Sequence, residues 1–373
     1  MMKKVFIVFL VFISVVGINL FSREELSRKN DSSEGLVEEA QTIEVDSETE
    51  AEVAPQPEVK TITITATGDC TLGNNYAQSY DGSFNSYYDA NGQDYFFQGV
   101  REVFQQDDFT VVNLECVLSD SNSRVEKQFN LKGKPEYVGI LTGSSVEACG
   151  LGNNHTLDYG EQGLSDTRAA LEQAGVVYAY NDSVGIYTTE DGITIGIVSA
   201  SLLSQGADRE AYIREGIESL KSQNVDLIIA CCHWGEEGTH TANNYQTVTA
   251  HKIIDWGADL VIGNHPHVLQ GIEEYNGKLI CYSLGNFSFG GNKNPKDKNT
   301  MMFQQTFTFV DGSLQNDIDG RIIPCTLSSS ASYNDYQPTI VTGEKKQSII
   351  DSVSSYSTGL GNLTFDEEGR IIP

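Results

Sequence analysis

The chain has 373 residues, a formal net charge of −28 and 39% apolar residues. This length accommodates one large domain or two ordinary ones, and the apolar fraction is sufficient for a sizeable core. The acidic balance argues strongly against nucleic acid as a partner, because phosphate backbones demand Lys and Arg. The chain has seven cysteines and no CxxC pair. Most of them lie in or beside apolar runs, so we expect buried thiols rather than a disulfide framework or a thiolate zinc site, with at most one bridge left open.

The amino terminus carries a targeting segment. Lys3 and Lys4 precede an apolar run over residues 5–21, which indicates a secretion signal of some kind. The run exceeds the roughly 7–15 apolar residues of a cleavable signal and approaches the lower limit of about 17 for a membrane span. We therefore predict a single-pass membrane anchor over residues 1–22, with the bulk of the chain extracytoplasmic. The alternative is a protein secreted after signal cleavage.

Residues 23–60 differ in composition from the rest of the chain. They include twelve acidic residues, two prolines and no aromatic residue. Such a segment buries too little apolar surface to offset its ordering entropy, so we expect a disordered acidic tether, extended by self-repulsion. We expect the folded domain over residues 61–325 and a C-terminal extension over 326–373, which contains one helix near 345–354.

Strands and helices alternate through most of the folded domain. In chain order, strands are predicted over 61–65, 109–114, 146–151, 176–180, 193–199, 225–232 and 260–262, and helices over 96–106, 161–174, 209–222 and 245–256. This alternation is typical of a mostly parallel, layered α/β domain. Alternating Thr- and Phe-rich segments over 301–310 and 322–327 then predict antiparallel strands that close a second sheet.

Side chains able to bind metal follow five of these strands. They are Asp69, Glu115, Asn154 with His155, His233, and His265 with His267. Ligand sites in open α/β sheets lie at the carboxyl ends of strands, so we expect these residues to gather at one edge. Each residue alone could serve a turn or a solvated surface, but their joint occurrence at strand ends favours a common site.

The chemistry of this set is coherent. Carboxylate, amide and imidazole ligands suit Mn, Fe, Zn or Mg rather than a thiolate site. Two such ions sharing a carboxylate can polarise a phosphoryl oxygen and activate a bridging water. A further histidine beside them can protonate a leaving group. The sequence therefore predicts a centre holding one or two divalent transition-metal ions (Mn, Fe or Zn).

Six motifs closely resemble the CapA family of capsule and poly-γ-glutamate synthesis proteins. They are GDCTLG (68–73), NLE (113–115), NNHTLDYG (153–160), HWGEE (233–237), GADLVIGNHPHVLQGIE (257–273) and YSLGNFSF (282–289). The resemblance covers roughly residues 61–325. It implies a calcineurin-like metallophosphoesterase fold, in which two stacked mixed β-sheets are flanked by helices as an α/β/β/α sandwich. Members are typically membrane-anchored, face outward and work with a separate membrane-bound synthetase on an anionic capsule polymer.

The resemblance also assigns roles to individual residues. It implies that the metal ligands are Asp69, Glu115, Asn154, His233, His265 and His267, and that His155 is the catalytic acid. The chain departs from the metallophosphoesterase pattern at two positions. Thr71 stands where the first Asp-x-His motif has its histidine, and Glu115 is one methylene longer than the usual bridging aspartate. One of the two metal sites is therefore expected to be weak or empty.

The function most consistent with these observations is that of a membrane-anchored accessory protein in capsule or poly-γ-glutamate synthesis. It would bind or process an anionic polymer at the metal centre, with Asn153 and the basic residues Arg124 and Lys132 as substrate-binding residues. One alternative is an extracytoplasmic metal-dependent phosphoesterase or other hydrolase acting on a cell-surface substrate. Another is a non-catalytic binding module that kept the pocket. Whether the chain is an enzyme stays open at this point.

Overall fold

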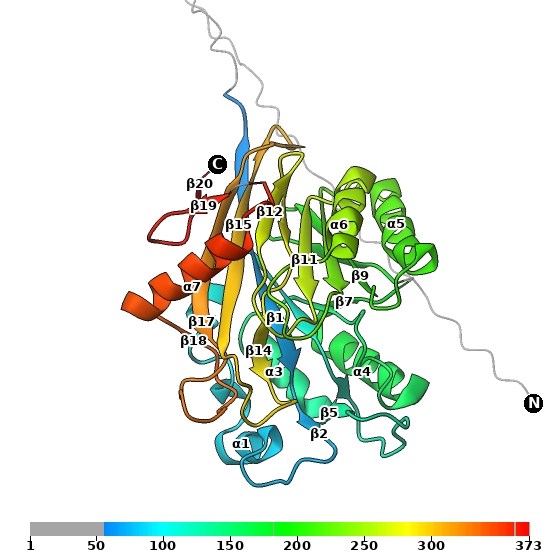
Figure 1. Cartoon of the computed structure of the whole chain (residues 1–373). Helices are drawn as coiled ribbons and strands as arrows, with labels where there is room; N and C mark the ends of the chain where they lie inside the picture. Colours follow the sequence, from blue (N-terminus) through cyan, green and yellow to red (C-terminus); the bar gives the residue numbers. More distant parts are fainter. Residues whose placement is uncertain (1–55, 182, 362, 373) are drawn as a thin grey trace, which may run out of the picture. The chain divides into compact units, whose positions relative to one another are not determined.

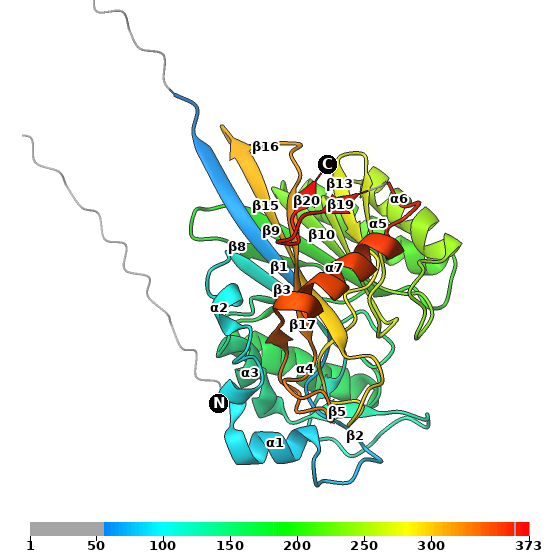
Figure 2. The same ribbon diagram turned by 60° about the vertical axis from the view of Figure 1, so that its left-hand side comes forward.

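The computed structural model describes residues 56–181, 183–361 and 363–372, shown in Figures 1 and 2. The predicted anchor over 1–22 and most of the predicted tether lie outside these residues. Within the described part of the chain, no helix is long and apolar enough to cross a membrane. The first strand, β1, begins at Val59, so the last two residues assigned to the tether belong to the folded unit.

The larger of two main sheets is organised around β1 (Val59–Thr71), the blue strand near the centre of Figure 1. Its strand order is β18 (Thr339–Ile340), β17 (Asp319–Thr326), β15 (Asn299–Val310), β1, β3 (Phe109–Leu114), β6 (Ala148–Gly150) and β7 (Val177–Ala179). In addition, β14 (Asn286–Phe289) pairs with β1, and β16 (Ser313–Leu314) with β15. Because β1 runs parallel to β3 and antiparallel to β15, the sheet is mixed.

The smaller sheet has a parallel centre and antiparallel edges. Its order is β12 (Ile272–Tyr275), β13 (Lys278–Cys281), β11 (Leu260–Asn264), β10 (Leu227–His233), β9 (Thr194–Ser201) and β8 (Gly185–Thr188). The antiparallel strands predicted over 301–310 and 322–327 form as β15 and β17, but the expectation that they close a second sheet is wrong. They extend the sheet of β1, because β15 pairs with β1 along its first eight residues, from Val59 to Ala66.

Helices flank both sheets. They are α1 (Phe84–Asn91), α2 (Arg101–Phe104), α3 (Val138–Thr142), α4 (Gly160–Ala174), α5 (Ala207–Ser222), α6 (Asn244–Trp256) and α7 (Gly343–Tyr356). Helices α5 and α6 lie on the smaller sheet, α3 and α4 lie beside the larger one, and α7 runs across β17 (Figures 1 and 2). The helix predicted over 96–106 is reduced to α2. The chain turns at Gly99, where a Cβ would lie 2.5 Å from the Pro338 carbonyl oxygen.

Three buried apolar clusters separate the layers. Side chains of a strand alternate between its two faces. In β10, Ile229 and Cys231 therefore enter the cluster between the sheets, whereas Ile228 and Ala230 face the cluster under α5 and α6. A third cluster lies between the larger sheet and α3 and α4. Four layers with three apolar interfaces confirm the predicted α/β/β/α sandwich, and all seven cysteines are buried and unpaired.

The remaining elements join this framework. A small sheet has the order β2 (Asn74–Asn75), β5 (Leu131–Gly133) and β4 (Val117–Leu118), and β19 (Thr364–Phe365) pairs with β20 (Ile371–Ile372). Beyond residue 325, β18 pairs with β17, and Ile349, Ile350 and Val353 of α7 enter the cluster between the two sheets.

Candidate metal centre

The six predicted ligands lie together where strands of both sheets end. Ligand atoms form two triplets, Asp69–Glu115–His267 and Glu115–His233–His265, each with its atoms within 4.8 Å of one another. The sixth ligand, Asn154, places its Oδ1 2.9 Å from His233 Nε2. The larger sheet thus supplies the carboxylates and the amide, and the smaller sheet supplies the imidazoles. Glu115 belongs to both triplets, so it has the position of a bridging ligand.

Glu115 is the most informative residue of the cluster. Its side chain is fully buried, and neither carboxylate oxygen has a hydrogen-bond partner. Burial and the neighbouring Asp69 raise the pKa of Glu115 well above its ordinary value. An unpaired buried carboxylate is costly, and Glu115 Oε1 has imidazole nitrogens 3.5 Å (His233 Nε2) and 3.9 Å (His267 Nε2) away. The donor set therefore fits a divalent cation, which would satisfy these orphaned oxygens.

Asp69 is held in place by neighbouring residues. It accepts a hydrogen bond of 2.8 Å from Asn113 Nδ2, and its Oδ2 lies 3.0 Å from His267 Nδ1. Asn113 Oδ1 in turn accepts from Asn153 Nδ2 at 3.2 Å. Asn153 also accepts from the His155 backbone N–H at 3.0 Å. The structure thus places Asn153, predicted to bind substrate, in the hydrogen-bond network that fixes the ligands.

The three ligand histidines differ in charge. Burial, reinforced by neighbouring imidazoles, lowers the pKa of His233 well below its ordinary value and that of His265 to about 4. Burial also opposes protonation of His267, but the charges of Glu115 and Asp69 outweigh it and raise its pKa to about 10. Burial thus favours neutral His233 and His265, the form in which imidazole binds metal, whereas the neighbouring carboxylates favour the protonated form of His267.

The turn after β11 aims two imidazoles at the cluster. His265 and His267 both have positive φ, 98° and 58°, a conformation that non-glycine residues rarely adopt and that is found at functional sites. Their ring centroids lie 5.6 Å apart, and that of His265 lies 4.7 Å from that of His233. Just before the turn, a Cβ on Gly263 would lie 2.1 Å from the Tyr282 carbonyl oxygen, so this close approach requires glycine.

His155 lies at the rim of the cluster with a defined orientation. Its Nδ1 is 2.7 Å from Asp158 Oδ2, and its Nε2 is 4.0 Å from Glu115 Oε1. Lys127 Nζ donates to Asp158 Oδ1 at 2.6 Å and to the Asn154 carbonyl at 2.9 Å. Burial lowers the pKa of His155. The sequence indicated Lys127 only as one of the basic residues in 122–135, and Asp158 was not identified, although it lies three residues after His155 in the NNHTLDYG motif.

Arg124 and Lys132 do not contact the cluster within the described structure. The Arg124 guanidinium lies 3.9 Å from the ring centroid of Tyr76, and Lys132 Nζ donates to the Ser121 carbonyl and lies 4.7 Å from the ring centroid of Tyr159. Arg124 and Tyr76 instead line an open groove of about 850 Å³ that also includes Lys127. Since Lys127 bonds the Asn154 carbonyl, this groove leads towards the metal ligands.

Sequence reasoning also missed two polar residues beside the histidines. Asn286 Oδ1 lies 2.9 Å from His267 Nδ1. Glu237 forms a third triplet of potential ligands with His265 and His267. The available signal was their position inside two of the motifs, YSLGNFSF and HWGEE.

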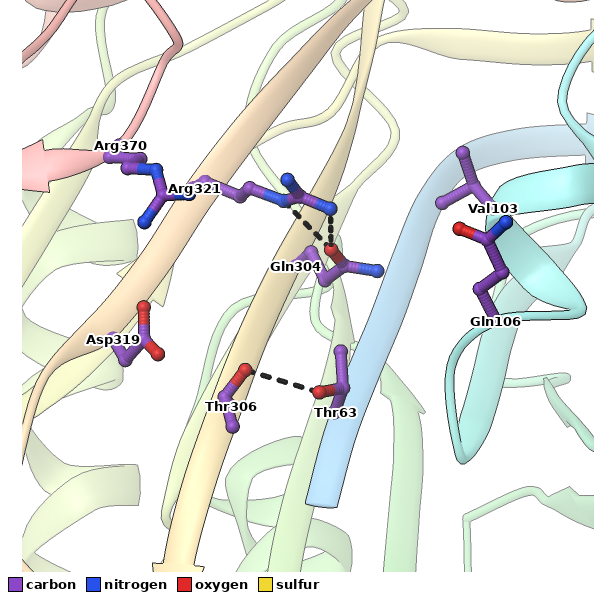
Figure 3. A pocket seen from close by; sticks show the side chains of 8 residues that line it. All are labelled: Thr63, Val103, Gln106, Gln304, Thr306, Asp319, Arg321 and Arg370. Carbon is purple, nitrogen blue, oxygen red and sulfur yellow. Dashed lines mark hydrogen bonds between the residues drawn. The ribbon is translucent and has the colours of Figure 1, made fainter. Parts of the chain in front are cut away.

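A separate cavity of about 270 Å³ lies on the larger sheet. Figure 3 shows its lining, which includes Arg321, Arg370 and Gln304, with Arg321 donating to Gln304 Oε1. Its β1 residue, Thr63, precedes Asp69 by six positions, and no predicted site residue lines this cavity. It is therefore distinct from the candidate metal centre.

Fold and site together define a two-sheet α/β protein with a candidate metal centre at its strand ends. Residues 63–291 match the family described as bacterial capsule synthesis protein PGA_cap, and the chain belongs to this family. This membership confirms the predicted resemblance to CapA proteins.

Two relatives are similar over about half of this chain. The chain is 32% identical over 220 residues to the PGA biosynthesis protein CapA of Bacillus subtilis (strain 168), covering 53% of this chain and 57% of the relative. It is 30% identical over 223 residues to the capsule biosynthesis protein CapA of Bacillus anthracis, covering 53% of this chain and 54% of that relative. The chain thus spans just over half the length of these relatives. Among solved structures, a hypothetical protein from Thermus thermophilus is 14% identical, with a TM-score of 0.44 over 70% of this chain and 99% of that one.

Proposed function

We propose that this chain is an accessory protein of capsule or poly-γ-glutamate synthesis that binds or processes an anionic polymer at a centre of one or two divalent metal ions. The observation that carries the proposal is the buried, unpaired Glu115 carboxylate, surrounded by five further ligand side chains from both sheets. Family membership supports the pathway, since two relatives are named for capsule or PGA biosynthesis.

The charge distribution supports binding of a polyanion at this place. The chain carries a net charge of −28, so the protein as a whole repels an anionic polymer. Local positive charge must therefore come from bound Mn, Fe or Zn and from the open groove beside Tyr76. Arg124 and Lys127 line that groove together with Glu126, so these two side chains are the cations that a polymer would meet on its way to the metal ligands.

Localisation and partners belong to the same proposal. An anchor over residues 1–22 would hold the domain outside the cell membrane, close to a membrane-bound synthetase and the emerging polymer. Cleavage of that segment would instead release a secreted protein. The apolar run over 5–21 and its preceding lysines support the extracytoplasmic placement.

A second candidate function is hydrolysis of a phosphoester or related bond. It is favoured by His155, whose Nδ1 is fixed by buried Asp158 and whose Nε2 faces the cluster. Bound metal would polarise the substrate and activate water. In its imidazolium form, His155 could then give the proton on Nε2 to the leaving oxygen, while Asp158 accepts from Nδ1 and holds the ring in the required orientation.

Metal content of the purified protein tests the centre directly. We expect close to two ions per wild-type chain, or about one if the site of Asp69, Glu115 and His267 is weak. We expect loss of metal in His265→Ala. His251→Ala is the matched control, because His251 lies on α6 and pairs with Glu273 at 2.9 Å, outside the cluster. Absence of metal from the wild type even after supplementation would refute the proposed centre.

Function is then tested by titrating the protein with poly-γ-glutamate of defined length, with and without Mn²⁺. Metal-dependent polymer binding that is lost in His265→Ala is the expected result. Turnover of a phosphodiester substrate that disappears in His155→Asn while metal is retained would favour the hydrolase. Polymer binding of equal strength with and without metal would contradict a role for the centre in recognition.

A further inference from the structure

The first metal site lacks the histidine that its motif leads one to expect. Thr71 occupies that position and is fully buried. Its hydroxyl donates to the Glu115 carbonyl at 3.1 Å, so it stabilises the backbone of the bridging residue. Of the predicted ligands, Asp69, Glu115 and His267 remain for this site. With three protein ligands, a tetrahedral metal site has one coordination position left, and a site of higher coordination number has more than one.

Glu237 lies where it can supply a further ligand. A carboxylate oxygen of Glu237 and one nitrogen each of His265 and His267 lie within 4.8 Å of one another. The His265 side chain also has a buried Nδ1 without a hydrogen-bond partner, and the residue is only 6% exposed. An unpaired imidazole nitrogen in a buried position indicates that an ion is to be bound within this cluster, which Glu237 borders.

The backbone explains why Glu237 reaches this place. The loop after β10 begins with Trp234, which is buried and whose Nε1 donates to the Tyr282 carbonyl at 2.9 Å. Gly235 and Gly238 then have positive φ values of 82° and 74°, and Gly238 N–H donates to the Pro266 carbonyl at 2.8 Å. The loop that carries Glu237 is thereby fastened to the turn that carries both histidines.

We propose that Glu237 is a metal ligand that completes the first site in place of the missing motif histidine. The inference rests on the proposed metal centre and adds a third carboxylate to it. Since Glu237 is exposed, it would bind the ion from the solvent side, where substrate also arrives. Three carboxylates facing two divalent ions leave the loaded centre with a small net positive charge, which suits an anionic ligand.

Adjacent residues provide a matched pair of variants. Glu236 is also exposed and is a glutamate too, but it belongs to none of the ligand triplets found among the described residues. Full-length wild type, Glu237→Gln and Glu236→Gln would be stripped with a chelator and titrated with MnCl₂ by calorimetry, with elemental analysis after desalting. We expect Glu237→Gln to bind its weaker ion about tenfold or more less tightly than wild type, whereas Glu236→Gln should bind as wild type does.

The outcomes separate this inference from the proposed function. Unchanged Mn²⁺ binding in Glu237→Gln would overturn the inference and leave the metal centre standing. Equal weakening in Glu237→Gln and Glu236→Gln would also overturn it, since loop charge and not ligation would then be the cause. Failure of wild type itself to bind Mn²⁺ would overturn both. If wild type binds a single ion, a rise in its Kd in Glu237→Gln alone would still support Glu237 as a ligand.

Discussion

At the scale of single residues, Asp158 links Lys127, which lines the groove, to the candidate site. Its carboxylate is buried and accepts from the Leu131 backbone N–H at 2.6 Å, from Lys127 and from His155. One side chain thus joins three groups from two segments of the chain. Asp158 makes the shortest contact to the His155 ring, at 2.7 Å, and so helps to set its orientation.

We predict that Asp158→Asn destabilises the protein by about 2–3 kcal/mol. The asparagine amide would present N–H groups where donors already converge, and the Lys127 ammonium would lose its anion. Urea unfolding of wild type and variant measures the difference. Asp166→Asn is the control, because Asp166 is only partly buried and accepts from Ser119 and Gln162; we expect less than about 1 kcal/mol there. Equal effects of the two variants would contradict the role given to Asp158.

At the scale of elements, two acidic side chains meet where β3 and β6 begin. Asp107 accepts from Thr110 Oγ1 at 2.7 Å, and Glu147 accepts from the Thr110 backbone N–H at 2.7 Å. Burial raises the pKa of both carboxyls to about 7, and each lies in the field of other carboxylates. Both groups are therefore easier to protonate in the folded than in the unfolded chain.

The sign of the resulting pH dependence follows by linkage. Because the folded-state pKa lies above the unfolded value, these carboxyls cost no stability below about pH 4, and their cost grows up to about pH 7. Asp107→Asn should remove part of this cost. We predict that the free energy of unfolding of the variant, relative to that of wild type, rises by on the order of 1 kcal/mol from pH 5 to pH 8.

Urea unfolding at the two pH values measures this gain. Gln106 is an exposed and uncharged neighbour of Asp107. The control variant Gln106→Ala should therefore change the free energy of unfolding equally at pH 5 and pH 8. Parallel pH curves for Asp107→Asn and wild type would show that Asp107 ionises alike in the folded and unfolded chains.

At the scale of the whole molecule, the candidate centre connects the two sheets. In the larger sheet, Asp69 lies near the end of β1 and Glu115 follows β3. In the smaller sheet, His233 ends β10, and His265 and His267 follow β11. A bound ion would therefore tie together the layers on either side of the central apolar cluster, in addition to any role with substrate.

We predict that chelation lowers the melting temperature of the metal-loaded wild type by roughly 5 °C. Ligand at a hundred times its Kd stabilises the folded state by about 2.7 kcal/mol, and each kcal/mol shifts Tm by about 2–4 °C in domains of 150–250 residues, and by less in larger ones. Thermal scans with and without chelator measure the shift, and His265→Ala should show little of it. An unchanged melting temperature in metal-loaded wild type would mean that metal does not couple the sheets.

The sequence by itself determined most elements and the composition of the site. The strand expected over 109–114 matches β3, and the helix expected over 161–174 matches α4 within one residue, ending at Gly175 with φ of 74°. Period-two and period-3.6 patterns are local, so they can be interpreted without knowledge of the fold. The strand-end residues were likewise found because parallel strands bring their carboxyl ends to one edge.

Only the tertiary structure decided how distant segments pair. It placed β15 beside β1, directed the Thr71 hydroxyl to Glu115, and brought Glu237 to the histidine turn. These contacts join segments that are far apart in the chain, or depend on a single loop hydrogen bond such as that from Gly238 to Pro266. A one-dimensional pattern gives the chemistry that a residue can offer, whereas the partner that uses it is fixed by packing and by the need to satisfy buried polar groups.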